Sequence, residues 1–122
     1  MIIIAFAQNT SKLLPRVCCR APRHCAPIIR VTQNHFIMYQ FVKRGYVAST
    51  ALNRRALELM QARGWCFIKS NHTVPKKLVQ YGQQCTSCVE FCKYAIGIQS
   101  ARPFTPRGLY KLCSVYLPNF LI

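Results

Sequence analysis

The sequence predicts a mainly helical or small α+β fold, with two amphipathic helices, a short strand between them and irregular segments at both ends. Apolar residues recur at helical spacing over residues 47–63 and again over about 75–96. Between these segments, residues 65–69 alternate in the manner of a strand. A chain of 122 residues has the length of one domain. We divide it into three regions: a basic segment without acidic residues (1–46), a small helical module (47–97) and an irregular tail that contains prolines (98–122).

The basic segment combines two kinds of pattern. Four of its cations fall on one face of a helical wheel and apolar residues fall on another, which is typical of peptides that adsorb to anionic lipid. We therefore expect peripheral contact with an anionic membrane, although prolines limit the helix to two short turns. Residues 34–42 are rich in aromatic and branched side chains and predict a strand. The four cations are Lys12, Arg16, Arg20 and Arg23.

The helix at 47–63 has signals at both ends. Ser49 or Thr50 is the expected N-cap, and Gly64 follows the last turn, where helices commonly end. Its apolar stripe consists of Leu52, Ala56, Leu59 and Met60.

The second helix, at about 75–96, is expected to begin after Thr73 with a proline in its first turn. Three cysteines continue its apolar stripe, and Gly82 costs this helix about 1 kcal/mol relative to alanine. Beyond residue 97 the prolines predict irregular structure.

The charge of the chain narrows its partners. Seventeen Lys and Arg residues face two acidic residues, so the formal net charge is +15, although only 16% of the residues are charged. The imbalance therefore comes from missing acids, and it favours RNA, a protein complex or an anionic membrane as the partner. With two glutamates, no Asp and no glycine motif that cradles phosphate, we expect no enzyme and identify no small-molecule substrate. No uncharged apolar run reaches the length of a transmembrane helix.

The cysteines suggest one metal site. Cys85, Cys88 and Cys92 follow one another at spacings of three and four, and His72 precedes them, which is a set that zinc uses. The alternative is that the three thiols line the buried stripe of a helix and that no cofactor is bound. The cysteine spacing also resembles part of a ferredoxin cluster motif, with one cysteine missing. A second group is less suited to one metal, because two of its cysteines are adjacent; it comprises Cys18, Cys19, His24 and Cys25.

A zinc-dependent nucleic-acid-binding protein is one functional hypothesis. Trp65, Phe67 and Lys69 alternate along one strand and would stack bases beside a phosphate contact. Arg54 and Arg55 would hold the phosphate backbone, together with Arg63, Lys76 and Lys77. The alternative is that Trp65 and Phe67 are core residues packed on the preceding helix.

Residues 43–50, Lys-Arg-Gly-Tyr-Val-Ala-Ser-Thr, resemble a mitochondrial presequence processing site, with Arg44 and Tyr46 at its two key positions. The resemblance implies cleavage after Tyr46 and a mitochondrial location. It supports the leading hypothesis, a small basic accessory or assembly component of mitochondria. Two alternatives remain: the zinc-dependent protein, located in the cytoplasm or nucleus, and the product of an open reading frame with little selective history and no defined activity.

Overall fold

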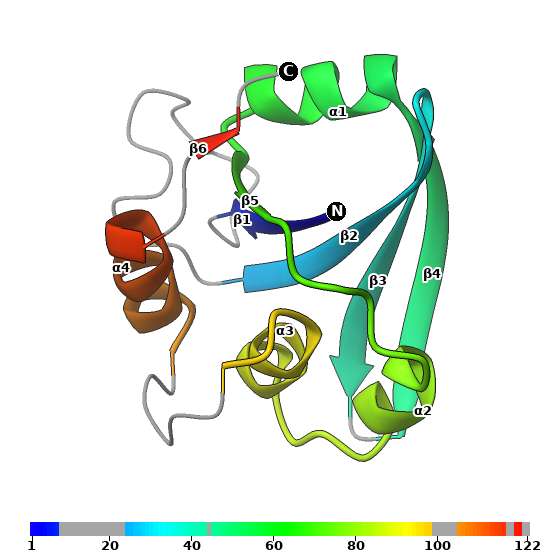
Figure 1. The fold of residues 1–122 in the computed structure, drawn as a ribbon, viewed down its shortest axis with the longest axis vertical. Coiled ribbons are helices and arrows are strands. Elements are labelled where there is room, and N and C mark those ends of the chain that lie inside the picture. The colour runs from blue at the N-terminus through cyan, green and yellow to red at the C-terminus, as the bar shows by residue number, and fades with distance from the viewer. Residues whose placement is uncertain (8–23, 44, 99–104, 117–118, 121–122) are drawn as a thin grey trace.

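An antiparallel sheet forms the centre of the molecule (Figure 1). The computed structural model describes residues 1–7, 24–43, 45–98, 105–116 and 119–120. The strands lie in the order β4-β3-β2-β1-β5-β6, and each neighbouring pair is antiparallel. Their bounds are β1 Ile2–Ala7, β2 His24–Thr32, β3 His35–Lys43, β4 Tyr46–Asn53, β5 Cys66–Ser70 and β6 Asn119–Phe120.

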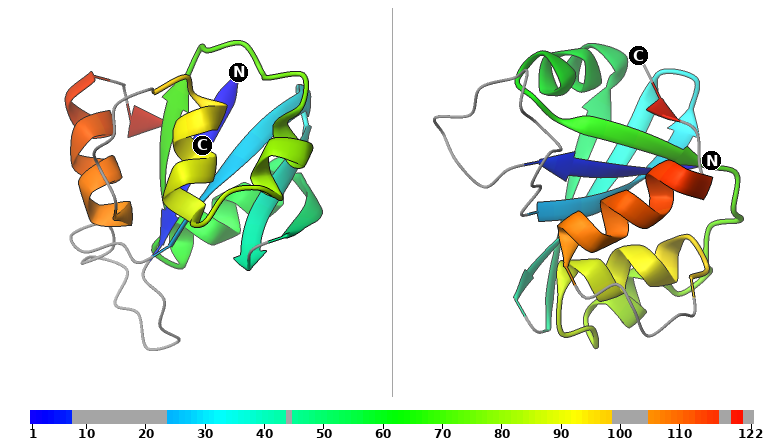
Figure 2. Two further views of the ribbon diagram at one scale, coloured as in Figure 1. Left: turned by 90° about the horizontal axis from the view of Figure 1, so that it is seen from below. Right: turned by 90° about the vertical axis from the view of Figure 1, so that its left-hand side faces the viewer.

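Helices cover both faces of the sheet (Figure 2). Alternate residues of β1 point to opposite faces. Ile3 and Ala5 pack with Leu57 on one side, and Ile2 and Ile4 pack with Cys92 and Leu109 on the other. Helix α1 covers the first side, and α3 and α4 cover the second, where α2 packs against α3. Their bounds are α1 Arg54–Ala62, α2 Leu78–Gly82, α3 Cys88–Ala95 and α4 Pro106–Tyr116.

The prediction of a mainly helical fold is wrong, because the described residues are organised around an antiparallel sheet, with 41% of them in strands and 34% in helices. Much of the error lies in the basic segment, where β1 and β2 were not predicted as strands. All six residues of β1 are buried. A strand that is buried on both faces shows no alternation of apolar and polar residues, so periodicity could not identify it. The four cations of the expected membrane-binding face lie outside the described residues.

The helix expected at 47–63 begins seven residues later. Residues Tyr46–Asn53 instead form β4, which pairs with β3. The true N-cap is Asn53, whose Oδ1 accepts the N–H of Ala56 at 2.8 Å, so neither Ser49 nor Thr50 has that role. The C-terminal signal is correct: Gly64 follows the helix with φ 102°.

The second predicted helix is two helices. Residues 83–87 separate α2 from α3, and Ser87 caps α3 by accepting the N–H of Glu90 at 3.2 Å. The tail is also not irregular throughout, because Pro106 begins α4. Proline suits the first turn of a helix, where its missing N–H has no intrahelical partner. The strands predicted at 34–42 and 65–69 are confirmed as β3 and β5, each displaced by one residue.

Within the described residues, no helix has the length and apolar character that crossing a membrane requires.

Candidate functional site

The residues of the expected zinc site do not surround a common point. Cys85 is fully buried between α2 and α3, where its Sγ donates to the carbonyl oxygen of Tyr81 at 3.4 Å. Cys92 belongs to a different cluster, against β1 and β2, and Cys88 packs on that same cluster. His72 is exposed and lies against Gly97, at the opposite end of α3 from Cys88. Within the described part of the chain, no group of three or more metal-ligating side chains is arranged to hold an ion.

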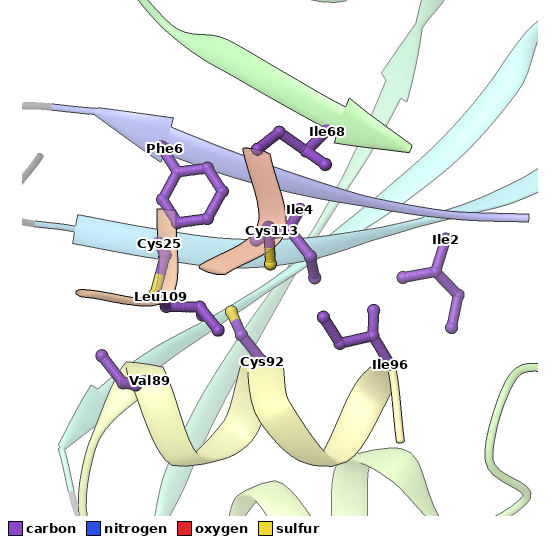
Figure 3. Packing of buried hydrophobic residues seen from close by; sticks show 10 residues of the cluster. All are labelled: Ile2, Ile4, Phe6, Cys25, Ile68, Val89, Cys92, Ile96, Leu109 and Cys113. Carbon is purple, nitrogen blue, oxygen red and sulfur yellow. The ribbon is translucent and has the colours of Figure 1, made fainter. Parts of the chain in front are cut away.

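Burial keeps the thiols of the core protonated. It raises the pKa of Cys85 to about 12 and that of Cys113 to about 11, because a thiolate is poorly solvated in an apolar environment. Burial also raises the pKa of Cys92. Figure 3 shows the side chains of Cys25, Cys92 and Cys113 directed into the core between the sheet and the helices. These cysteines therefore act as small apolar core residues that remain protonated at neutral pH.

The aromatic residues proposed for base stacking are also part of the core. Phe67 is buried in the cluster beneath α1 and is closed to a ligand. Trp65 is half-buried against the same cluster, and its ring lies edge-on to His24 at a centroid distance of 6.2 Å. Lys69 is half-buried as well. Trp65 and Phe67 therefore contact the cluster beneath the preceding helix, as the alternative prediction expected.

The two arginines proposed to hold phosphate lie at the start of α1. Arg54 donates to the carbonyl oxygen of Gln33 at 3.5 Å. The Arg55 guanidinium lies 3.6 Å from the Glu58 carboxylate, and the Arg55 side chain is three-quarters exposed. Arg55 is therefore partly neutralised, and an exposed pair of this kind contributes little to stability.

A basic surface site lies elsewhere, on the segment between β5 and α2. Two adjoining open pockets of about 570 and 470 Å³ share Val74, Pro75 and Lys76 in their lining. Lys77 and Tyr39 line the first pocket, with Ile29 and residues 78–80; the second pocket is completed by His72, Thr73, Tyr94, Gly97 and Ile98. We call the two pockets together the lysine site.

Two features of the fold shape the lysine site. Gly97 has φ 74°, and a Cβ there would lie 2.6 Å from Cε1 of His72, so only glycine allows the histidine ring this position. Tyr94 stacks on Tyr81, with ring centroids 3.8 Å apart and an angle of 16° between the planes. The site therefore combines Tyr39 and Tyr94 with the exposed side chains of Lys76 and Lys77, and Tyr94 is held from outside the lining by Tyr81.

Neither of the two glutamates in the chain lines this site. Glu58 lies beside Arg55 on α1, and Glu90 accepts hydrogen bonds from the backbone N–H and the hydroxyl of Thr86, the latter at 2.8 Å. The positive potential of Lys76 and Lys77 is thus not cancelled by a carboxylate in the lining. Sequence patterns included these lysines among general phosphate contacts but did not place them beside tyrosines.

The expected processing site lies at the turn between β3 and β4. Arg44 is outside the described residues. Tyr46 is the first residue of β4, is 61% exposed, and has the Lys43 Nζ 4.9 Å from its ring centroid. Cleavage after Tyr46 would separate β1, β2 and β3 from the rest of the sheet.

Comparison with protein-family models, curated proteins and solved structures gives no match.

Proposed function

We propose that this chain is a small basic accessory protein, not an enzyme, that binds single-stranded RNA at the lysine site. The observation that carries the proposal is the position of Lys76 and Lys77 beside Tyr39 and Tyr94, in open pockets that neither glutamate lines. Ammonium groups attract phosphate, and tyrosine rings stack on bases of any sequence. The combination fits a flexible single strand better than a duplex, because its bases are free to stack.

The charge of the whole molecule supports the same partner. Two carboxylates cannot neutralise seventeen Lys and Arg side chains, so most of the positive charge remains available to a polyanion. The few acidic groups also argue against acid–base catalysis, since Glu58 is paired with Arg55 and Glu90 accepts a hydrogen bond from Thr86. The mitochondrial location implied by residues 43–50 stays a prediction.

Binding of a fluorescent oligouridine, followed by anisotropy over a range of salt concentrations, tests the proposal. Replacing Lys76 and Lys77 together with alanine should weaken binding and make the slope of log affinity against log salt shallower by about 0.7 per lysine. The matched control is the double variant Arg107→Ala/Lys111→Ala on α4, which removes the same charge from exposed positions. Its slope should stay close to that of the parent.

If the two double variants lose the same affinity for oligouridine, the proposed binding site is wrong, because only the net charge of the protein would then matter. A Tyr94→Leu variant tests the stacking contribution, which we expect to be about 1–3 kcal/mol. Polyglutamate is the second ligand to compare. If it binds as tightly as the oligouridine, base stacking plays no part and the RNA proposal is wrong.

A further inference from the structure

Two cysteines from distant parts of the sequence meet where α3 begins. Cys25 lies in β2 and Cys88 is the first residue of α3, 63 residues later. Their Sγ atoms are 3.7 Å apart, within the distance of a sulfur hydrogen bond. A disulfide needs about 2.05 Å between the sulfurs, so an approach of about 1.7 Å would join them. That approach is small for a side chain at the edge of a cluster.

The two thiols differ in access to solvent. Cys25 is fully buried, whereas Cys88 is half-buried at the rim of the cluster. A small reagent in solution therefore reacts first with the Cys88 thiol. The buried Cys25 thiol can react only with a group that is already bonded to Cys88. One accessible thiol with a buried partner in contact is the arrangement in which an attacking and a resolving cysteine work together.

We propose that Cys25 and Cys88 form a dithiol modification site, which a low-molecular-weight disulfide such as oxidised glutathione converts into a covalent bond between β2 and α3. The Cys88 thiol loses its proton and attacks one sulfur of the oxidant, which releases one glutathione thiolate. The Cys25 thiol then loses its proton and attacks Sγ of Cys88, which releases the second glutathione thiolate. The two released thiolates take up the two protons. The cysteine pair gives up two electrons and the oxidant gains them.

The environment of the site makes this reaction slow at neutral pH. The hydrogen bond shared with Cys25, and then burial, raise the pKa of Cys88 to about 12. Only the thiolate attacks a disulfide, so the reaction rate should rise about tenfold for each pH unit between about 7 and 9. The thiols therefore resist brief exposure to an oxidant and respond to sustained oxidation.

The other cysteines that contact the same core cluster are less suited to disulfide exchange with glutathione. Cys92 also shares a hydrogen bond with Cys25, but it has no exposed surface through which an oxidant could reach it. Cys113 is 1% exposed. Cys66 already takes part in a disulfide.

The test exposes the full chain, without prior reduction, to oxidised glutathione and follows its intact mass. We expect the loss of two hydrogens without a lasting glutathione adduct, a Cys25–Cys88 link in the peptide map and a higher melting temperature. The Cys25–Cys88 link should disappear from the peptide map after treatment with dithiothreitol. A Cys25→Ala variant should stop at one glutathione on Cys88, and a Cys88→Ala variant should not react at this site. Cys113→Ala, in the same cluster, is the matched control and should behave like the parent.

Two results would overturn the proposal. One is a folded parent chain that still keeps both thiols after sustained exposure to oxidised glutathione at a pH of about 9, where the expected rate is highest. The other is a peptide map that links Cys25 to Cys92. The parent chain alone decides both questions, so the proposal stays testable even if an alanine variant does not fold. The result is also independent of RNA binding, because neither cysteine lines the lysine site.

Discussion

Gly82 lies at the end of α2, where its Cα faces the ring of Phe91. A Cβ built on Gly82 would lie 2.7 Å from Cε1 and 2.9 Å from Cζ of that ring. Phe91 has no exposed surface, so its ring cannot move aside into solvent. The packing of α2 on α3 therefore requires glycine at this position. The close contact with Phe91 that glycine allows offsets its low helix propensity.

Gly82→Ala should lower the free energy of unfolding by about 1–3 kcal/mol, because the added methyl overpacks the core. Helix propensity alone gives the opposite sign, a gain of about 1 kcal/mol. Urea unfolding measures the difference, and Gln83→Ala, at the exposed neighbouring position, is the control that should change little. A stabilised Gly82→Ala variant would show that α2 does not pack on Phe91.

At the scale of an element, α1 shows how one side chain sets the boundary between a strand and a helix. Residues 47–53 include apolar side chains at spacings that also suit a helix, yet they pair with residues His35–Phe41 of β3. The helix begins only where Asn53 adopts an extended backbone, with φ −107° and ψ 177°, and accepts the N–H of Ala56. Pairing with the preceding strand thus outweighed local helix propensity, which is a weak preference.

Asn53→Ala should reduce the free energy of unfolding by about 1 kcal/mol, because the first turn of α1 loses its cap. Asn53→Asp keeps an acceptor oxygen and should stay close to the parent. Thermal or urea unfolding of both variants gives the answer. Thr50→Ala separates the two possible helix boundaries: it should have little effect on stability, since Thr50 is an exposed strand residue here. A larger loss from Thr50→Ala than from Asn53→Ala would place the helix start inside β4.

At the scale of the whole molecule, β1 holds the fold together. It pairs with β2 on one edge and β5 on the other, and its two faces supply residues to two separate clusters. The small helical module predicted at 47–97 therefore lacks the strand on which both of its layers pack. A fragment without β1, β2 and β3 would expose the apolar faces of α1 and α3 to water.

Residues 47–122, produced alone, should show no cooperative thermal transition, whereas the full chain should show a single one. Circular dichroism during heating makes the comparison. A cooperative transition in the fragment would support both the predicted module and processing after Tyr46. A broad, non-cooperative transition of the full chain would instead favour the hypothesis of a chain with little selective history.

The amino-acid sequence by itself determined the features that depend on composition or on neighbouring residues. The charge of +15 and the scarcity of acids follow from composition. The strands β3 and β5 and the end of α1 at Gly64 follow from local patterns. These local features were predictable because a few adjacent residues are enough to indicate a strand or the end of a helix.

Only the tertiary structure decided the rest. It made the apolar N-terminus a central strand, changed the first half of a predicted helix into β4, and divided the cysteines of the expected zinc site between two clusters. It also brought Cys25 to Cys88, and Lys76 and Lys77 to the tyrosines. Except for β4, which pairs with the preceding strand, these features depend on contacts between residues far apart in the chain. Local periodicity carries no information about such contacts, and the free energy of burying β1 on both faces outweighs local preferences.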